Sequence, residues 1–242
     1  MGAPSPTPDS DRPPQTPTET MQSYLVTGAN RGIGLEFCRQ LAARNEEIFA
    51  VCRTSSDELA ALDVTVYDGI DVNDPVALEP LALELDCIDI DVLIHNAGSY
   101  ERAGWDELDE EAFAAAERMF RTNAIGPLRL TRAFRDNLYE NSKVAIITSL
   151  MGSMADNGSG GSYGYRMSKA AVNAAGVSLA RDLASRTISV GMLHPGMVAT
   201  DMTGGNGISV EESVRGLLAR IEELGPENTG RFWHQDGREL PW

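Results

Sequence analysis

Short apolar segments alternate with helix-length segments along most of the chain, and this alternation limits the fold more than any other feature of the sequence. Six segments have the near-continuous apolar character of strands buried on both faces. They read SYLVTG, EEIFAVCR, VTVYDG, DVLIHNAG, KVAIITS and TISVGMLHPG. Strands separated by helices of about ten or more residues form right-handed crossovers in a parallel sheet. The pattern therefore predicts an α/β fold with helices on both faces of the sheet.

Length and charge narrow the class of protein further. The 242 residues suit one α/β domain, which we place at residues 22–242 because no repeat or linker interrupts them. No apolar run approaches the roughly 20 residues of a membrane span. The net charge of −16 opposes binding to nucleic acid or to an anionic membrane. Three scattered cysteines and three histidines without metal-site spacing predict no disulfide framework and no metal, as in a cytoplasmic protein.

The N-terminal tail and the basic residues are unusual in composition. Residues 1–21 are rich in Pro, Ser and Thr and carry no apolar core of a signal peptide, so we expect a disordered tail. Lys143 and Lys169 are the only lysines in the chain, whereas 36 residues are acidic. This predicts an acidic surface and suggests the hypothesis of a salt-rich environment. An ordinary acidic cytoplasmic protein is the alternative.

A glycine-rich loop follows the first predicted strand and opens the first predicted helix. It reads TGANRGIG and contains Gly28, Gly32 and Gly34. Glycines here allow a tight turn, a close approach of the backbone to a pyrophosphate, and packing of the helix on the strand. The loop indicates a dinucleotide site, with a tight structural turn as the alternative.

The residues after the second and third strands bear on which dinucleotide binds. Arg53 stands where an NAD-specific site would place an acidic residue for the ribose hydroxyl. Arg31, inside the glycine-rich loop, is the second candidate for a 2′-phosphate, because a guanidinium matches phosphate oxygens. For each arginine, simple surface exposure is the alternative. Asp71 follows the third strand, where a carboxylate can accept from an adenine amino group.

The segment YGYRMSK offers Lys169 two tyrosines. Residues four apart share a helix face, so Tyr165 is expected to face Lys169 and Tyr163 to point elsewhere. A nearby ammonium lowers the pKa of a phenol, which predicts a tuned acid-base group at Tyr165. Ser149 ends the fifth strand, at the sheet edge where ligands bind. Asn123 lies in a predicted helix where Asn is disfavoured, which hints at a functional role. An ordinary helix pair and an exposed Asn are the alternatives.

Together these motifs resemble the short-chain dehydrogenase/reductase family over residues 23–242, and most closely its carbonyl-reductase branch that includes C-factor and sniffer. The matching segments are TGANRGIG, the Asp71 step, HNAG, RTNAIGPL, the strand-end Ser149, YRMSK and HPGMVATDM. The resemblance implies a doubly wound Rossmann fold with a mostly seven-stranded parallel sheet. It also implies a homodimer or homotetramer that pairs the helices containing Asn123 and Tyr165. His95 in place of the usual Asn, and a lengthened loop before Tyr165, depart from the family pattern.

The resemblance also implies the residues of the site and its ligands. The catalytic residues would be Asn123, Ser149, Tyr165 and Lys169. The cofactor would be NADP(H), with NAD(H) less favoured, and the substrate a small carbonyl compound or alcohol. The cofactor contacts would be Gly28, Asn30, Arg31, Gly32, Ile33, Gly34, Arg53, Asp71, Val72, Asn96, Ala97, Gly98, Tyr165, Lys169, Pro195, Gly196, Val198 and Thr200.

Two other functions are compatible with the same scaffold. A regulatory protein could bind NAD(P) and turn it over only incidentally, because fold does not determine function. A structural protein without a nucleotide is the second, although the glycine-rich loop disfavours it.

Overall fold

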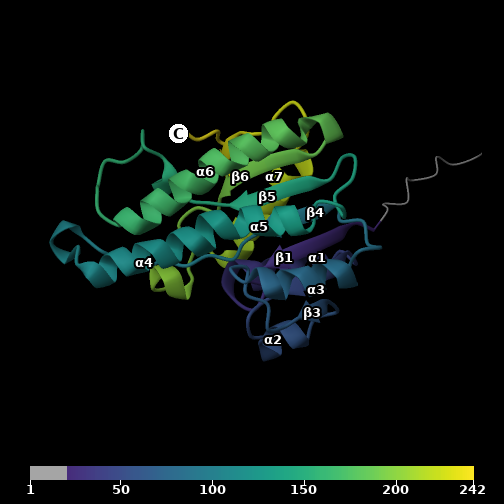
Figure 1. Cartoon of the computed structure of the whole chain (residues 1–242). Helices are drawn as coiled ribbons and strands as arrows, with labels where there is room; N and C mark the ends of the chain where they lie inside the picture. The colour runs from purple at the N-terminus through teal and green to yellow at the C-terminus, as the bar shows by residue number, and fades with distance from the viewer. Residues whose placement is uncertain (1–20) are drawn as a thin grey trace, which may run out of the picture.

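Seven parallel strands form the sheet of the protein, for which a computed structural model describes residues 21–242 (Figure 1). The predicted tail therefore lies outside the described residues, apart from Met21. The strands are β1 (Ser23–Thr27), β2 (Glu47–Val51), β3 (Thr65–Tyr67), β4 (Val92–His95), β5 (Lys143–Ile147), β6 (Ser189–His194) and β7 (Phe232–His234). Their order in the sheet is β3-β2-β1-β4-β5-β6-β7. This confirms the predicted doubly wound α/β fold and adds β7 to the six strands read from the sequence pattern.

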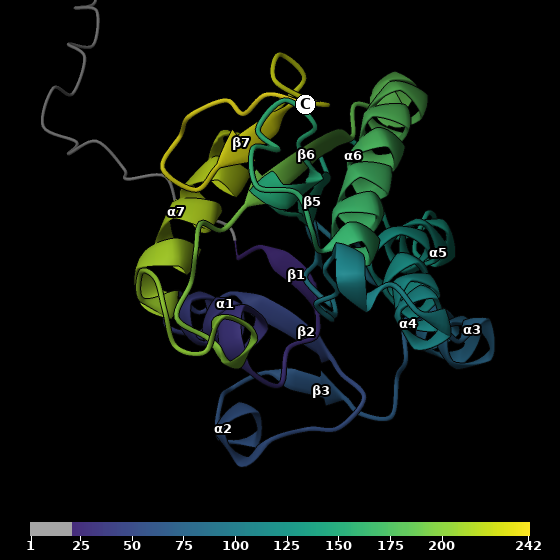
Figure 2. The same cartoon turned by 90° about the vertical axis from the view of Figure 1, so that its left-hand side faces the viewer.

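Helices cover both faces of this sheet (Figure 2). They are α1 (Gly32–Ala42), α2 (Asp57–Ala60), α3 (Pro75–Glu84), α4 (Glu110–Phe120), α5 (Gly126–Ala133), α6 (Tyr163–Leu183) and α7 (Val210–Glu223). Short turns of helix are η1 (Trp105–Glu107), the π-turn η2 (Arg121–Ile125), η3 (Leu150–Gly152), η4 (Ala184–Arg186) and η5 (Asp201–Thr203). Helices α1 and α7 lie on one face, and α3, α4, α5 and α6 on the other (Figure 2).

Each face of the sheet has its own apolar core. Phe37 of α1 and Leu217 of α7 are fully buried against one face. Leu81 of α3, Leu130 of α5 and Val172 of α6 are buried against the other. Because both faces are covered, the inner strands are apolar along their whole length, which is why they appear in the sequence as continuous rather than alternating runs.

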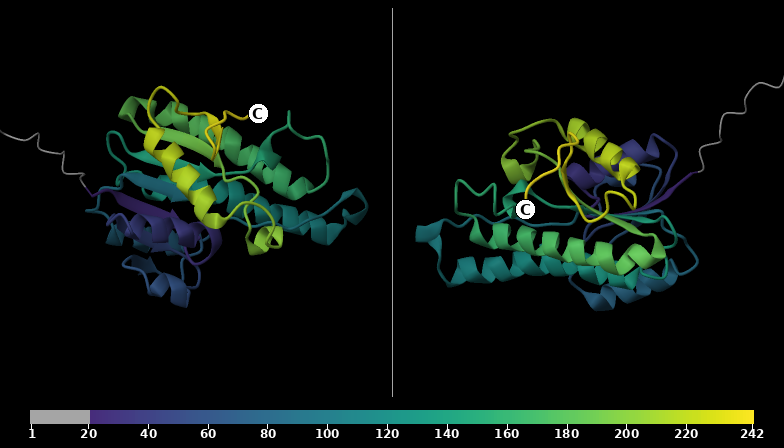
Figure 3. Two further views of the ribbon diagram at one scale, coloured as in Figure 1. Left: turned by 180° about the vertical axis from the view of Figure 1, so that it is seen from behind. Right: turned by 90° about the horizontal axis from the view of Figure 1, so that it is seen from above.

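Local sequence signals define where the helices begin. Helix α4 begins after Asp109, whose side chain accepts a hydrogen bond from Ala112 N at 2.9 Å. Helix α3 begins with Pro75 behind an Asp74 cap. Both arrangements satisfy or remove donors that a first helical turn leaves free. Helices α4 and α5 follow one another through η2 and form one long helical segment, and helix α6 lies beside it (Figure 3).

The strand order reverses between β1 and β4, since β2 lies on one side of β1 and β4 on the other. In doubly wound sheets, ligands bind at the carboxyl ends of the strands beside such a switch point. The loops after β1, β4, β5 and β6 all leave the sheet at this edge. The fold thus brings together the segments that hold most of the predicted site residues.

Candidate active site

Helix α6 presents Tyr165 and Lys169 on its buried side. Their side chains are 8% and 6% exposed, and Lys169 Nζ lies 5.8 Å from the centre of the Tyr165 ring. Tyr163, two residues earlier, is 38% exposed and faces Trp105 instead, with 6.4 Å between ring centres. Helical spacing therefore identified the tyrosine that accompanies the lysine.

Burial dominates the electrostatics of Tyr165. Burial raises the pKa of Tyr165 to about 12, a hydrogen bond with Ser149 lowers it in part, and neighbouring Tyr100 raises it. From the sequence we expected the adjacent ammonium to lower the pKa of Tyr165. In the structure, the surrounding protein raises this pKa instead. The physical reason is that desolvation penalises phenolate more than its neighbours stabilise it. At neutral pH Tyr165 is consequently a phenol that holds its proton.

Lys169 is a cation enclosed by protein. Its Nζ donates to the Ile147 carbonyl oxygen at 3.0 Å, at the end of β5. Burial lowers the pKa of Lys169 to about 8, because the charged form loses its hydration. This ammonium is therefore held in place by the sheet and carries a desolvation penalty.

Ser149 precedes and caps η3, and it lies two residues beyond the end of β5. Its hydroxyl accepts from Met151 N at 3.1 Å, and its side chain is 9% exposed. The preceding residue, Thr148, donates through its hydroxyl to Asn173 Oδ1 of α6 at 2.8 Å. This bond ties the segment that carries Ser149 to the helix that carries Tyr165.

Asn123 occupies the π-turn η2 rather than a regular α-helix. Its Nδ2 donates to Ser99 O and to Ser168 Oγ, both at 2.9 Å, and its Oδ1 accepts from Ser99 N at 2.8 Å. The amide is 2% exposed. Asn123 thereby joins the loop after β4 to helix α6, and π-turns of this kind are frequent at functional sites.

The glycine-rich loop forms a closely packed turn around the N-terminus of α1, here called the glycine cradle. Side chains in place of its glycines would occupy the space it encloses. Gly28 and Gly32 have left-handed φ values of +66° and +54°. A Cβ on Gly34 would stand 2.1 Å from the Gly28 carbonyl oxygen, and one on Gly28 would stand 3.0 Å from Ala97 Cα. Only glycine fits at these positions. The first turn of α1 thus presents backbone N–H groups at an open helix end, which fits a dinucleotide pyrophosphate.

Asn96 and Thr27 connect the loop after β4 to this cradle. Asn96 Nδ2 donates to Thr27 O at 3.0 Å and to Gly28 O at 3.1 Å. The Thr27 hydroxyl accepts from the backbone N–H groups of Asn96 and Ala97, both at 3.1 Å. The HNAG segment therefore supports the glycine-rich loop, and its last residue, Gly98, lies near both Asn123 and Lys169.

The two arginines predicted to meet a 2′-phosphate are both exposed. Arg31 forms an ion pair with Asp201 of η5, with 3.2 Å between Nη1 and Oδ2. Arg53 lies just past β2 at the surface. The Asn30 carbonyl oxygen between β1 and α1 accepts from Ser56 Oγ at 2.8 Å, so the loops after β1 and β2 adjoin. Ile33 of α1 is half-buried.

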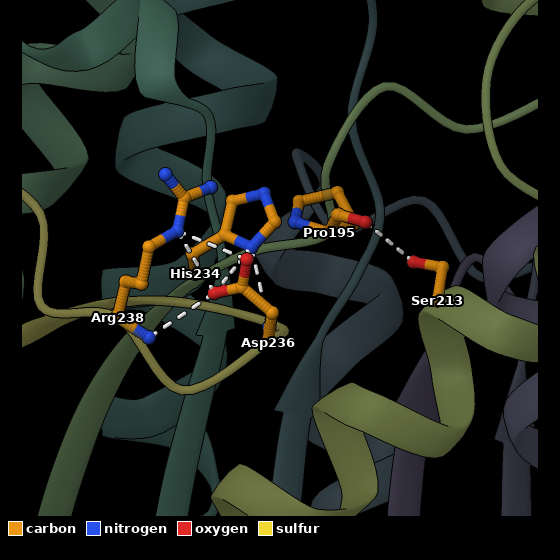
Figure 4. Close-up of polar contacts among 5 residues, drawn as sticks. All are labelled: Pro195, Ser213, His234, Asp236 and Arg238. Atoms are coloured by element: carbon orange, nitrogen blue, oxygen red, sulfur yellow. Dashed lines mark hydrogen bonds and ion pairs between the residues drawn. The ribbon is translucent and has the colours of Figure 1, made fainter.

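The third strand and the loop after β6 complete the predicted contacts. Asp71 Oδ1 accepts from Asn73 N at 2.8 Å, and Val72 is buried against Gly126. Pro195 follows β6, and its carbonyl oxygen accepts from Ser213 Oγ at 2.7 Å (Figure 4). Gly196 adopts a left-handed φ of +83°, Val198 pairs with Ile208, and Thr200 precedes and caps η5.

Three contributing residues were absent from the sequence prediction. Thr27 is the hydrogen-bond hub between two loops, Ser168 supports Asn123, and the Tyr100 ring packs edge-on against Tyr165 with 4.8 Å between ring centres. Ser168 could have been predicted, because it stands one residue before Lys169 in the YRMSK motif. Tyr100 could not, because it is 65 positions from Tyr165 and no local pattern connects the two. Within residues 21–242 no helix is long and apolar enough to span a membrane, and no cluster of His, Cys, Asp and Glu could hold a metal ion.

Comparison with known proteins gives a consistent result. The family model described as short chain dehydrogenase matches residues 22–208. A 1-hydroxy-2-glutathionyl-2-methyl-3-butene dehydrogenase of Rhodococcus sp. is 41% identical over 92% of this chain and 100% of its own length. The C-signal protein of Myxococcus xanthus is 45% identical over 63% of this chain and 93% of its own length.

Solved structures agree with these relatives. An NADPH-bound carbonyl reductase from chicken fatty liver superposes with a TM-score of 0.83 at 30% identity, over 92% of this chain and 99% of that one. The carbonyl reductase Sniffer of D. melanogaster gives the same TM-score at 29% identity, over 92% and 100%. The resemblance read from the motifs is thereby confirmed, and the chain belongs to the short-chain dehydrogenase/reductase family.

Proposed function

We propose that this oxidoreductase transfers hydride between NADP(H) and a carbonyl or secondary alcohol, using Tyr165 as the proton donor and acceptor. The observation that carries the proposal is the meeting of Tyr165, Ser149 and Lys169 beside the glycine cradle of α1. The nicotinamide supplies the hydride when bound, and the protein supplies position and proton transfer. The relatives support both directions of the reaction, since one is named a dehydrogenase and others are named carbonyl reductases.

Each side chain has a role that follows from its surroundings. Tyr165 holds its proton at neutral pH, since burial raises its pKa to about 12, and so can donate to a substrate oxygen that gains charge. Ser149, hydrogen-bonded to Tyr165, is a second donor to the same oxygen. Lys169 places a positive charge near the phenol and stabilises the phenolate left after proton transfer. Asn123 holds the loop after β4 against α6.

The preference for NADP(H) rests on the charges around the adenosine end. No acidic residue follows β2 in the segment CRTSS, and Arg53 is exposed there. Arg31 projects from the N-terminus of α1. Arg31 forms an exposed ion pair with Asp201, which a 2′-phosphate would compete for. Two guanidinium groups at this end of the site favour a 2′-phosphate over a free hydroxyl. The carbonyl reductase from chicken, described as NADPH-bound, supports the same preference.

NADPH consumption against a panel of aldehydes, ketones, quinones and 3-oxoacyl compounds tests this function. At least one carbonyl is expected to be reduced by the wild type, and Tyr165→Phe is expected to lower kcat at least a hundredfold while the Kd for NADPH changes less than about threefold. Equal turnover by both proteins would refute the role of Tyr165. Tight NADPH binding without reduction of any carbonyl would favour the alternative of a regulatory protein. The name of the C-signal relative agrees with that alternative.

We also propose that two copies pair through α4 and α6. Four large side chains on η1, α4 and α6 are between 38% and 74% exposed: Trp105, Phe113, Tyr163 and Met167. Phe113, Tyr163 and Met167 line a surface hollow of about 400 Å³, and Trp105 lies beside Tyr163 with 6.4 Å between ring centres. Clusters of large exposed apolar side chains on a protein surface mark interaction sites. Sedimentation should give a dimer or larger for the wild type and a monomer for Trp105→Glu, whereas equal masses would exclude this face as the interface.

A further inference from the structure

The last strand brings a polar cluster to the edge of the sheet that carries the proposed nicotinamide site. Strands β6 and β7 pair in register so that His194 lies opposite His234. The two imidazoles meet edge to face, with 5.1 Å between ring centres. Gln235 N then donates to His194 O at 2.9 Å, which extends the pairing by one residue. The C-terminal segment is thus fastened where the chain leaves β6 toward Pro195.

The His234 ring covers the turn formed by Pro195 and Gly196. A Cβ on Gly196 would stand 3.6 Å from His234 Nε2 and 3.9 Å from Cε1. On its other side, the Pro195 carbonyl oxygen accepts from the buried Ser213 hydroxyl of α7 at 2.7 Å. Figure 4 shows Pro195 between the His234 imidazole and Ser213. The turn is therefore held from both sides.

A charged pair fixes the imidazole itself. His234 Nδ1 lies 2.9 Å from Asp236 Oδ1, and Arg238 Nε donates to both carboxylate oxygens of Asp236 at 3.1 and 2.9 Å (Figure 4). His234 Nδ1 also lies 3.2 Å from Asp236 N, which donates to it, so Asp236 holds this nitrogen through its side chain and its backbone. The Nε2 edge of the ring is then directed at Gly196.

The neighbouring histidine does not compete for this arrangement. Burial lowers the pKa of His194 to about 3, with smaller contributions in the same direction from His234, Arg238 and Lys169 and an opposing one from Asp236. His194 is therefore an uncharged ring at neutral pH, and it packs against the edge of His234.

We propose that His234 is a positioning residue for the nicotinamide half of the cofactor site, acting through the Pro195–Gly196 turn. The inference rests on the proposed function and on the cofactor contacts that the family resemblance implies for Pro195 and Gly196. Gly196 has a wide choice of backbone conformations, and a packed ring against its Cα limits that choice. His234 lies beyond residues 22–208, the part that the family model matches, so the family pattern does not include it.

The affinities for two ligands distinguish a role of His234 in positioning the nicotinamide half of the site from a general role in the stability of the fold. NADPH contains the nicotinamide, whereas 2′,5′-ADP contains only the adenosine end with its phosphates. For His234→Ala we expect the Kd of NADPH, measured by nucleotide fluorescence, to rise about tenfold, and the Kd of 2′,5′-ADP, measured by calorimetry, to change less than twofold. His234→Gln should recover part of the loss, since it keeps a polar side chain near Asp236.

The control is Glu239→Gln, which removes an exposed ion pair with Arg231 in the same segment and should change neither Kd. Asp236→Asn provides a second perturbation if His234→Ala fails to fold, with an expected loss of about threefold for NADPH alone. An unchanged NADPH affinity in the folded variants, or an equal loss for both ligands, would overturn the proposal. A wild type that does not bind NADPH would instead overturn the proposed function.

Discussion

Replacing Lys169 with Met should stabilise the free protein while it abolishes turnover. Lys169 is 6% exposed, and burial lowers its pKa from 10.5 to about 8. That fall corresponds to a folding cost of about 3 kcal/mol at pH 7, since one pKa unit is worth about 1.4 kcal/mol. Met has a similar length and no charge, so the substitution removes this cost.

The gain is partly offset by a lost hydrogen bond. The Ile147 carbonyl oxygen accepts from Lys169 Nζ at 3.0 Å, and leaving that buried acceptor without this donor costs about 1 to 3 kcal/mol. A net gain of about 1 kcal/mol is expected, which corresponds to a rise in Tm of about 3 °C for a domain of this size. Turnover should fall at least a hundredfold, because the phenolate of Tyr165 loses its nearby cation.

The pH dependence distinguishes this explanation from better packing. Between pH 8 and pH 10.5 the unfolded chain holds the Lys169 proton more tightly than the folded chain does, so wild-type stability rises with pH through this window. The Met variant lacks the group. Urea unfolding should therefore find the variant more stable at pH 7 and the wild type equal or more stable near pH 10.5. A variant that is less stable at pH 7, with a gap that stays constant to pH 10.5, would refute the reasoning.

Three further perturbations test separate parts of the site and surface. Arg53→Asp should shift the ratio of kcat/KM from NADPH toward NADH by at least tenfold, since it exchanges a phosphate partner for a hydroxyl partner; an unchanged ratio counts against it. Gly34→Ala should lower stability by at least about 2 kcal/mol and abolish NADPH binding, because its Cβ would lie 2.1 Å from Gly28 O. A net charge of −16 predicts a higher Tm in molar KCl than in dilute buffer, and an unchanged Tm would refute the salt hypothesis.

The sequence predicted those features that depend on local spacing. Tyr165 and Lys169 meet because they are four residues apart on one helix, and the glycine cradle follows from a strand, a loop and a helix in succession. The apolar pattern of the sequence did not reveal strand β7, because this strand has only three residues, one of them His234, and no longer apolar run surrounds it. Its existence depends on pairing with β6, a contact between distant parts of the chain.

The directions of the pKa shifts of Tyr165 and Lys169 could not be predicted from their spacing in the sequence. A lysine near a tyrosine lowers the pKa of the phenol when both are hydrated, but here both side chains are more than 90% buried. Desolvation is then the largest influence on both groups, and it raises the pKa of Tyr165 while it lowers that of Lys169. Burial of this degree arises from Tyr100, Asn123 and the loop after β5, which the sequence does not place around α6.

Transfer of deuterium from NADPH that carries deuterium at both C4 positions to the carbonyl carbon of a reduced substrate tests the central claim most directly. Mass spectrometry should find the label on that carbon in the wild-type product, and Tyr165→Phe should lower the rate of its appearance at least a hundredfold at equal cofactor occupancy. A product without deuterium, or equal rates for the two proteins, would contradict hydride transfer assisted by Tyr165.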